Sequence, residues 1–300
     1  MKKLTLFFAL SIAILTTTAL ITYSCKKDRI QPPEEEDVLN AYNPINSYLD
    51  SKKQQEQEFV ITGPANDTII GNQGTKIYGS KQCLRYPNGD TIDYPFSIYL
   101  VELYTPKDMI YWQMPTIAAG NILETDGEIR VRAVANGQEL VLQGSCPYGF
   151  EMPNASPQSN MKVYLGTDNG SFVDWTDSGV PFTTTAYGYL GYTNTLGWAN
   201  CDKLGASGSH TLSFTSSVDD LTNVGIFIYI PSTRTVMQVY NMVSGLIPNG
   251  ETVKIVLMAQ DASGQLFSYT ETRTVNASAS IDITLSQTTD AALTAYLDGL

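Results

Sequence analysis

Hydrophobic and polar positions alternate along most of the chain with the two-residue period of half-buried β-strands. The alternation is clear in residues 96–104 (FSIYLVELY) and 129–134 (IRVRAV), where the arginines of the second run take the polar face. Asn-Gly turn signals occur at Asn88–Gly89 and Asn136–Gly137. The pattern predicts an all-β protein built from short strands and hairpins.

The strand patterns predict two β-sandwich domains. Residues 57–145 are expected to form the first sandwich, and residues 146–205 a connecting β-region that begins with several prolines. Residues 206–300 are expected to form a second sandwich of the immunoglobulin-like or prealbumin-like kind, with a short C-terminal helix at 291–297. The strands predicted for this second sandwich are residues 210–215, 223–230, 235–240, 251–259, 265–275 and 280–285.

The N-terminus departs from the strand pattern. Lys2 and Lys3 precede an apolar run at residues 4–21, and Ser24 precedes Cys25. This order predicts a lipoprotein signal peptide, residues 1–24, whose removal leaves Cys25 as an N-terminus that carries acyl chains such as palmitate. The alternative is an uncleaved transmembrane anchor, because the run is about long enough to span a bilayer.

Residues 25–56 are expected to form a lipidated tether that ends in a short helix. The charged, proline-containing segment 26–36 is typical of a disordered linker. Apolar residues in segment 37–55 have roughly helical spacing, which Pro44 interrupts. We therefore expect a protein held on the outer membrane by its acyl chains, facing the periplasm or the cell surface.

The charge of the chain argues against nucleic acid as a partner. The formal net charge is −12, and loss of Lys2 and Lys3 with the signal peptide brings it to −14. No cluster of Lys and Arg occurs beyond residue 30. Binding to nucleic acid needs a basic face that neutralises phosphates, and this sequence does not provide one.

Three cysteines remain when Cys25 is lipidated: Cys83, Cys146 and Cys201. In an oxidising compartment three thiols leave at least one unpaired. Two interpretations stay open at this point. All three are buried, inert thiols that act as small apolar side chains, or two of them form one disulfide.

Several strings of the sequence resemble a known family. They are TIIGNQGTKI (68–77), KDMIYWQMPTIAAGNILETDGEIRVRAVANGQEL (107–140) and NTLGWANCDKL (194–204). They resemble a family of lipid-anchored outer-membrane β-proteins of Bacteroidetes that has no assigned activity, most specifically at Leu196–Asp202 (LGWANCD). The first domain also distantly resembles ZU5-type β-sandwiches, although Tyr78-Gly79-Ser80 departs from their usual Ile-Pro pattern. The resemblance implies no catalytic residues.

The same motif gives the sharpest candidate site. Trp198, Asn200 and Asp202 could line a polar pocket in which the indole serves as a platform for a sugar ring. The structural alternative is that Trp198 fills a core between domains and Asp202 caps a turn. Trp175 and its neighbour Asp174 are further candidate binding residues.

Aromatic side chains concentrate in the middle of the chain, and glycan-binding faces combine such rings with Asn, Asp and Gln. Strands bury aromatic residues in any case, so the concentration also fits an ordinary core. The aromatic residues in question are Tyr148, Phe150, Tyr164, Phe172, Trp175, Phe182, Tyr187, Tyr189 and Tyr192.

A glycosidase would need two carboxyl groups at a defined separation, and the sequence spacing selects no pair. The candidate carboxyl groups are Glu102, Glu124, Asp126, Asp174, Asp177 and Asp202. His210 is the single histidine, and Asp168-Asn169-Gly170 lacks the later ligands of a calcium loop. We expect no cofactor and no metal. The predicted role is non-catalytic binding or scaffolding, with a glycan or an envelope protein as partner; the alternative is a carboxylate-dependent hydrolase acting on polysaccharide or cell-wall material.

Overall fold

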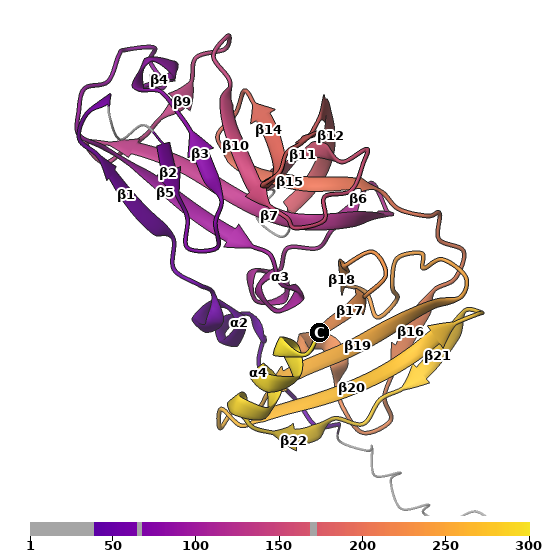
Figure 1. Cartoon of the computed structure of the whole chain (residues 1–300). Helices are drawn as coiled ribbons and strands as arrows, with labels where there is room; N and C mark the ends of the chain where they lie inside the picture. Colours follow the sequence, from indigo (N-terminus) through magenta and orange to yellow (C-terminus); the bar gives the residue numbers. More distant parts are fainter. Residues whose placement is uncertain (1–38, 65–67, 169–172) are drawn as a thin grey trace, which may run out of the picture. The chain divides into compact units, whose positions relative to one another are not determined.

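A computed structural model describes residues 39–64, 68–168 and 173–300 (Figure 1). Strands make up 51% of the structure, about twice the average for globular proteins, and most lie in antiparallel sheets. The predicted all-β class is therefore confirmed. The predicted signal peptide, Cys25 and the first part of the predicted tether lie outside the described residues.

Strands β1–β15 build the first sandwich. Their bounds are β1 (Gln57–Ile61), β2 (Thr68–Ile70), β3 (Lys76–Tyr78), β4 (Leu84–Arg85), β5 (Phe96–Leu103), β6 (Ile117–Ala118), β7 (Asn121–Ala135), β8 (Gln138–Glu139), β9 (Val141–Leu142), β10 (Tyr148–Pro153), β11 (Lys162–Asp168), β12 (Val173–Pro181), β13 (Thr183–Thr184), β14 (Gly188–Thr193) and β15 (Gly197–Leu204). One sheet has the order β1-β5-β7-β15-β11-β12, and the other has the order β13-β14-β10-β3-β2. Ile98 and Val131 of the first sheet meet Ile77 and Phe150 of the second in one apolar core, so the two sheets pack face to face.

The pairing of these strands differs from the predicted division at residue 145. Strand β10 pairs with β3, and β15 pairs with β7, so residues 146–205 complete both sheets of the first sandwich. The alternating pattern marks each strand but does not encode its partner. The central strand β7 needs a neighbour on both sides, and the second neighbour comes from beyond the proline-rich break.

Strands β16–β22 build the second sandwich, and all six strands predicted for it are present. Their bounds are β16 (Leu212–Thr215), β17 (Gly225–Ile230), β18 (Thr235–Val239), β19 (Glu251–Gln260), β20 (Leu266–Val275), β21 (Ala279–Asp282) and β22 (Ser286–Thr288). The main sheet has the order β18-β17-β19-β20-β22, and the parallel pair β16–β21 packs over one of its faces. Phe214, Ile228 and Ile255 lie in the core between them.

Three short helices lie in a layer between the two sandwiches (Figure 1). They are α2 (Asn46–Lys52), α3 (Pro106–Trp112) and α4 (Asp290–Asp298), and single 3₁₀ turns occur at η2 (Lys81–Cys83) and η3 (Leu221–Asn223). Leu49, Met109 and Leu297 of the helices share one core with Val101 of β5 and Phe227 of β17. Strand β17 therefore packs on the helix layer with one face and on the β16–β21 pair with the other, which explains why every one of its residues is buried.

The predicted C-terminal helix is confirmed as α4, whereas α3 was not predicted. Helix α3 nevertheless begins with a common N-terminal capping pattern. The Thr105 side chain accepts a hydrogen bond from the Asp108 backbone N–H, and Pro106 takes the first helical position.

The segment that precedes β1 packs against the second sandwich. The Tyr42 hydroxyl donates to Asp219 Oδ1 at 2.7 Å, and the backbone N–H of Asn40 donates to the Val218 carbonyl at 2.9 Å. Tyr42 and Leu49 are buried. The described part of the predicted tether, residues 39–56, is thus folded, and α2 confirms its short helix.

Cys83 and Cys146 form a disulfide with Cα atoms 5.3 Å apart, and Cys201 is a free, buried cysteine. Of the two interpretations open from the sequence, the single disulfide is therefore the one found. It joins η2 to the loop before β10, across the predicted boundary at residue 145.

Candidate functional site

The two candidate tryptophans lie in the core between the sandwiches. Trp198 is 7% exposed and packs edge-on against Trp112, with ring centroids 5.6 Å apart. The Arg130 guanidinium lies 5.7 Å from its ring. Trp175 is buried in the same core, and its indole nitrogen donates to the Pro115 carbonyl at 2.8 Å. Neither ring presents an open face, so this arrangement favours the structural interpretation of both residues.

Asn200 and Asp202 follow Trp198 on the same face of β15 and are fully buried. They lie opposite Glu128 and Thr125 of β7, which are also fully buried. Thr125 donates its hydroxyl to Asn200 Oδ1 at 3.0 Å. The motif thus forms part of a polar cluster inside an otherwise apolar layer.

A β-bulge in β7 shapes this cluster. The register between β7 and β15 shifts between Asn200 and Asp202, so that Asp126 and Gly127 together lie opposite Cys201. Gly127 has a φ of +122°, and a side chain there would collide with the ring of Tyr104.

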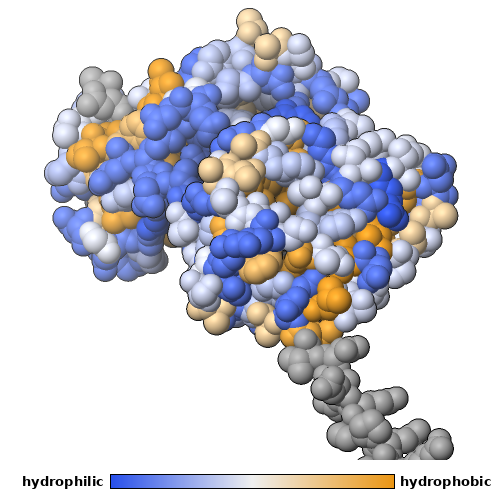
Figure 2. All heavy atoms as spheres, turned by 90° about the horizontal axis from the view of Figure 1, so that it is seen from below, coloured by the Kyte–Doolittle hydropathy of each residue, from blue (hydrophilic) through white to orange (hydrophobic). Residues whose placement is uncertain are grey.

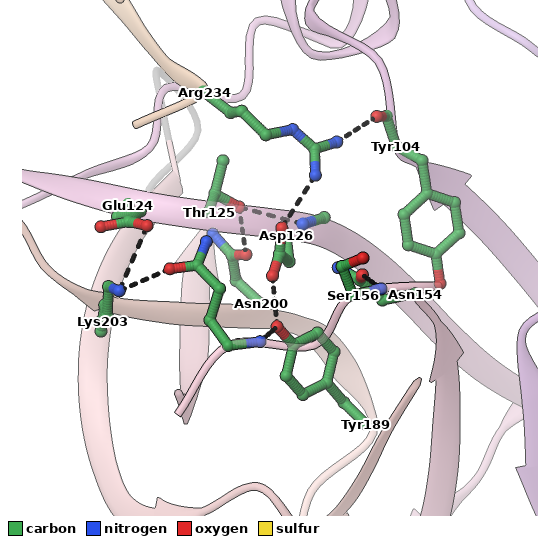
Figure 3. Close-up of polar contacts among 12 residues, drawn as sticks. Tyr104, Glu124, Thr125, Asp126, Asn154, Ser156, Tyr189, Asn200, Lys203 and Arg234 are labelled. Atoms are coloured by element: carbon green, nitrogen blue, oxygen red, sulfur yellow. Dashed lines mark hydrogen bonds and ion pairs between the residues drawn. The ribbon is translucent and has the colours of Figure 1, made fainter. Parts of the chain in front are cut away.

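Asp126 at the bulge connects the two sandwiches (Figure 3). Its Oδ1 accepts from the Arg234 guanidinium at 2.8 Å, and its Oδ2 accepts from the Tyr189 hydroxyl. Arg234 lies in the β17–β18 turn and also donates to the Tyr104 carbonyl at 2.9 Å. The Thr125 amide adds a backbone hydrogen bond of 3.0 Å to the Thr233 carbonyl of the same turn. The cluster therefore holds the β17–β18 turn on β7.

Burial disfavours the charged form of two carboxyl groups of the cluster. Burial raises the pKa of both Glu128 and Asp202 well above the ordinary value, and for Asp202 it outweighs the lowering effect of Thr125 and Asn200. Glu128 Oε2 and both oxygens of Asp202 have no hydrogen bond of normal geometry to the described residues. These groups are closed off from solvent, so a polysaccharide cannot reach them unless the layers separate.

The described residues contain no group of three or more His, Cys, Asp or Glu side chains arranged to hold a metal ion. Cys201 is also a poor nucleophile, because burial raises the pKa of its thiol well above the usual range. The burial of Cys201 argues for a packing role of this side chain.

Asp174 is separated from the other candidates. It is exposed on β12 and lines a groove of about 350 Å³ together with Gln238 and Tyr240 of the second sandwich. The groove walls are mostly apolar, with Pro115 and Ile117 among them. The structure therefore does not bring the five predicted site residues together into one pocket.

A different surface carries exposed aromatic side chains. They lie on the solvent side of the β13-β14-β10-β3-β2 sheet of the first sandwich. One row across its strands consists of Thr68 of β2, Tyr78 of β3, Gly149 of β10 and Tyr192 of β14. We call this row the tyrosine face. Tyr78 is 38% exposed and Tyr192 is 47% exposed, which is high for tyrosines in the middle of a sheet.

Gly149 gives the tyrosine face its shape. A Cβ atom at this position would lie 3.1 Å from Tyr192 Cε1 and 3.7 Å from Tyr78 Cδ2. The two rings thus lie over the glycine from opposite sides, in space that any other residue would fill. The result is an aromatic platform on the solvent side of this sheet.

Glu151 holds one half of this platform in place. Its Oε2 accepts from the Tyr78 hydroxyl at 2.8 Å and from Lys76 Nζ at 2.9 Å, and its Oε1 accepts from the Thr185 hydroxyl at 3.2 Å. Burial alone would raise the pKa of Glu151, but Lys76 and the two hydroxyl donors outweigh it and hold the pKa below its ordinary value. Glu151 is therefore a carboxylate at neutral pH and fixes the Tyr78 ring before any ligand arrives.

Figure 2 shows one face of the molecule, on which apolar residues lie in separate patches within a largely hydrophilic surface. Single exposed apolar residues are ordinary. The tyrosine face differs from such single residues, because its two rings pack over one glycine and a carboxylate holds one of them in place.

Comparison of the chain with protein-family models, with curated proteins and with solved structures gives no match. The resemblance to lipid-anchored β-proteins, and the ZU5-like and immunoglobulin-like or prealbumin-like details of the two sandwiches, therefore stay predictions. The candidate site rests on the geometry of this chain.

Sequence reasoning placed Tyr192 among the aromatic residues of the middle segment but missed Tyr78, Gly149 and Glu151. Their strands are far apart in the sequence and become neighbours through the β3–β10–β14 pairing. A usable signal was present in the alternation of β10, where Gly149 and Glu151 occupy the polar positions between Tyr148, Phe150 and Met152.

Proposed function

We propose that this chain is a lipid-anchored protein of the cell envelope that binds a glycan through the tyrosine face and does not catalyse a reaction. The observation that carries the proposal is the pair of exposed rings, Tyr78 and Tyr192, over Gly149. One face of a sugar ring presents C–H groups, which pack well on an aromatic ring. Its hydroxyl groups need polar partners at the rim.

The rim of the tyrosine face offers such partners. Thr68 extends the row beyond Tyr78 and is exposed, and Lys76 and Glu151 lie in the next row of the same sheet surface. Rigid aromatic side chains supply contact area at a low cost in conformational entropy, and polar groups around them fix the orientation of a ligand. Binding on a preformed platform needs little rearrangement.

The hydrolase alternative finds less support. The carboxyl groups that the fold gathers, Asp126, Glu128 and Asp202, are at most 5% exposed. Asp126 is engaged by Arg234 and Tyr189. A retaining or inverting mechanism needs two carboxyl groups that face the same bound sugar.

The anchoring part of the proposal rests on the sequence around Cys25. Among the described residues, no helix has both the length and the hydropathy to cross a membrane. We propose attachment to the outer membrane through acyl chains on Cys25. The Cys25→Ala variant should lose labelling by an alkyne fatty acid in cells, and continued labelling of that variant would refute the site.

A glycan array with the purified full chain in detergent tests the binding role. We expect binding that the Tyr78→Ala and Tyr192→Ala variants weaken by about tenfold or more, since the loss of a central aromatic contact costs about 2 kcal/mol and each 1.4 kcal/mol is a factor of about ten. Tyr240→Ala is the matched control, because Tyr240 is 49% exposed but lies on the second sandwich. An array with no hits, combined with turnover of a polysaccharide, would favour the hydrolase instead.

A further inference from the structure

The tyrosine face continues into a groove on one side. Tyr192 also lines a groove of about 330 Å³ between β12 and the turn that links β14 to β15. The row across the sheet and this groove therefore share one side chain. When one sugar of an oligosaccharide stacks on Tyr192, the next sugar of the chain lies in the groove.

The groove offers hydrogen-bonding groups from the turn at Thr193–Thr195. The side chain of Asn194 is exposed and makes no hydrogen bond to the described residues, so its amide can both donate and accept. The hydroxyls of Thr193 and Thr195 lie 3.3 Å apart and hold the turn in shape. The opposite wall carries apolar side chains such as Leu165 and Val180. This combination of one apolar wall and one polar wall suits a sugar edge.

The charge of this region selects against acidic ligands. The residues that line the groove are all uncharged. The chain as a whole carries a net charge of −12. A polyanionic glycan would meet this negative potential without a basic groove to offset it.

The length of the combined surface selects against a single sugar. The backbones of Tyr78 and Tyr192 are separated by two strand spacings, about 10 Å, and the groove begins beyond Tyr192. One sugar stacked on each tyrosine accounts for a disaccharide, so the unit that reaches Asn194 is at least the third.

We propose that the ligand is a neutral, linear oligosaccharide that lies across the strands from Tyr78 over Tyr192 and into the groove at Asn194. This inference rests on the proposed glycan-binding function and adds the ligand's charge, its direction and a minimum length greater than a disaccharide.

Titration calorimetry of the full chain in detergent, with mono-, di-, tetra- and hexasaccharides of neutral β-linked glucan, α-linked glucan and mannan as probes, tests the inference. For the series that binds, we expect the tetrasaccharide to bind at least about tenfold more tightly than the disaccharide, because it alone reaches the groove. The Asn194→Ala variant should lose several-fold affinity for the tetrasaccharide and keep its affinity for the disaccharide. Asn121→Ala, which removes another exposed amide, is the matched control and should change neither.

Equal affinities for the di- and tetrasaccharide, or an equal effect of Asn194→Ala on both, would overturn the inference while leaving the proposed function intact, provided Tyr78→Ala and Tyr192→Ala still weaken binding. Binding of an acidic glycan in preference to every neutral probe would also overturn it. If binding occurs but neither tyrosine variant affects it, the proposed function itself fails.

Discussion

Replacing Trp198 with alanine tests whether the Gly-Trp-Ala-Asn-Cys-Asp motif serves packing. The side chain is 7% exposed and lies in the core between the two sandwiches, in edge-on contact with Trp112 and beneath Arg130. Removal of a buried large aromatic residue costs about 3–5 kcal/mol of unfolding free energy. The edge-on contact contributes about 0.5–1.5 kcal/mol beyond area burial, so we expect a loss in the upper part of the range, about 4–5 kcal/mol.

Urea unfolding followed by far-ultraviolet circular dichroism measures this loss. Leu204→Ala on the same strand is the control, since Leu204 is 62% exposed and its removal should change the unfolding free energy by no more than about 0.5 kcal/mol. Glycan affinity below the transition should be unchanged in both variants. A loss below about 1 kcal/mol for Trp198→Ala, together with abolished glycan binding, would refute the packing role and return the motif to the functional site.

Three further predictions concern the disulfide and the buried cluster. The double variant Cys83→Ala/Cys146→Ala should lose about 4 kcal/mol of unfolding free energy, because the bond closes a loop of 63 residues; a loss below about 1 kcal/mol would contradict this. The pKa values of Glu128 and Asp202 are raised by burial, so the stability these groups contribute is complete below their unfolded values near pH 4 and is lost as the pH rises toward their folded values. Glu128→Gln and Asp202→Asn should therefore flatten the fall in melting temperature as the pH rises above about 4, and a pH profile identical to that of the parent chain would refute the burial argument. Arg234→Ala should cost about 1–3 kcal/mol and raise hydrogen exchange in the β17–β18 turn, since it removes a charged hydrogen bond to Asp126; unchanged exchange there would show that the turn is held by other contacts.

The strands were predictable because each has a local pattern. In β7, buried Ile129, Val131 and Ala133 alternate with the less buried Arg130 and Arg132, and periodicity alone detects this arrangement. Pairing is not local, so the place of β10 and β15 in the first sandwich could not be read from the sequence. The packing of residues 39–56 against the second sandwich was missed for the same reason, since the partners Val218 and Asp219 are far along the chain.

The candidate site also has a part that could be predicted from the sequence and a part that could not. The sequence left two interpretations of Trp198 open, and its burial agrees with the one in which it fills a core between domains. The tyrosine face depends on the register that places Tyr78 and Tyr192 on either side of Gly149, and a register shift of one residue would turn both rings into the core. Such a site is a property of the sheet and not of any continuous motif.

The most direct test of the proposed function is the affinity of the full chain for its best glycan from the array, measured for the parent chain and for Tyr78→Ala, Tyr192→Ala and Tyr240→Ala. Both variants of the tyrosine face should keep the parent melting temperature within a few degrees, because their side chains are exposed, and should bind at least about tenfold more weakly. Tyr240→Ala should bind as the parent does. Parent-like affinity in both tyrosine-face variants, or an equal loss in Tyr240→Ala, would contradict the assignment of this face as the binding site.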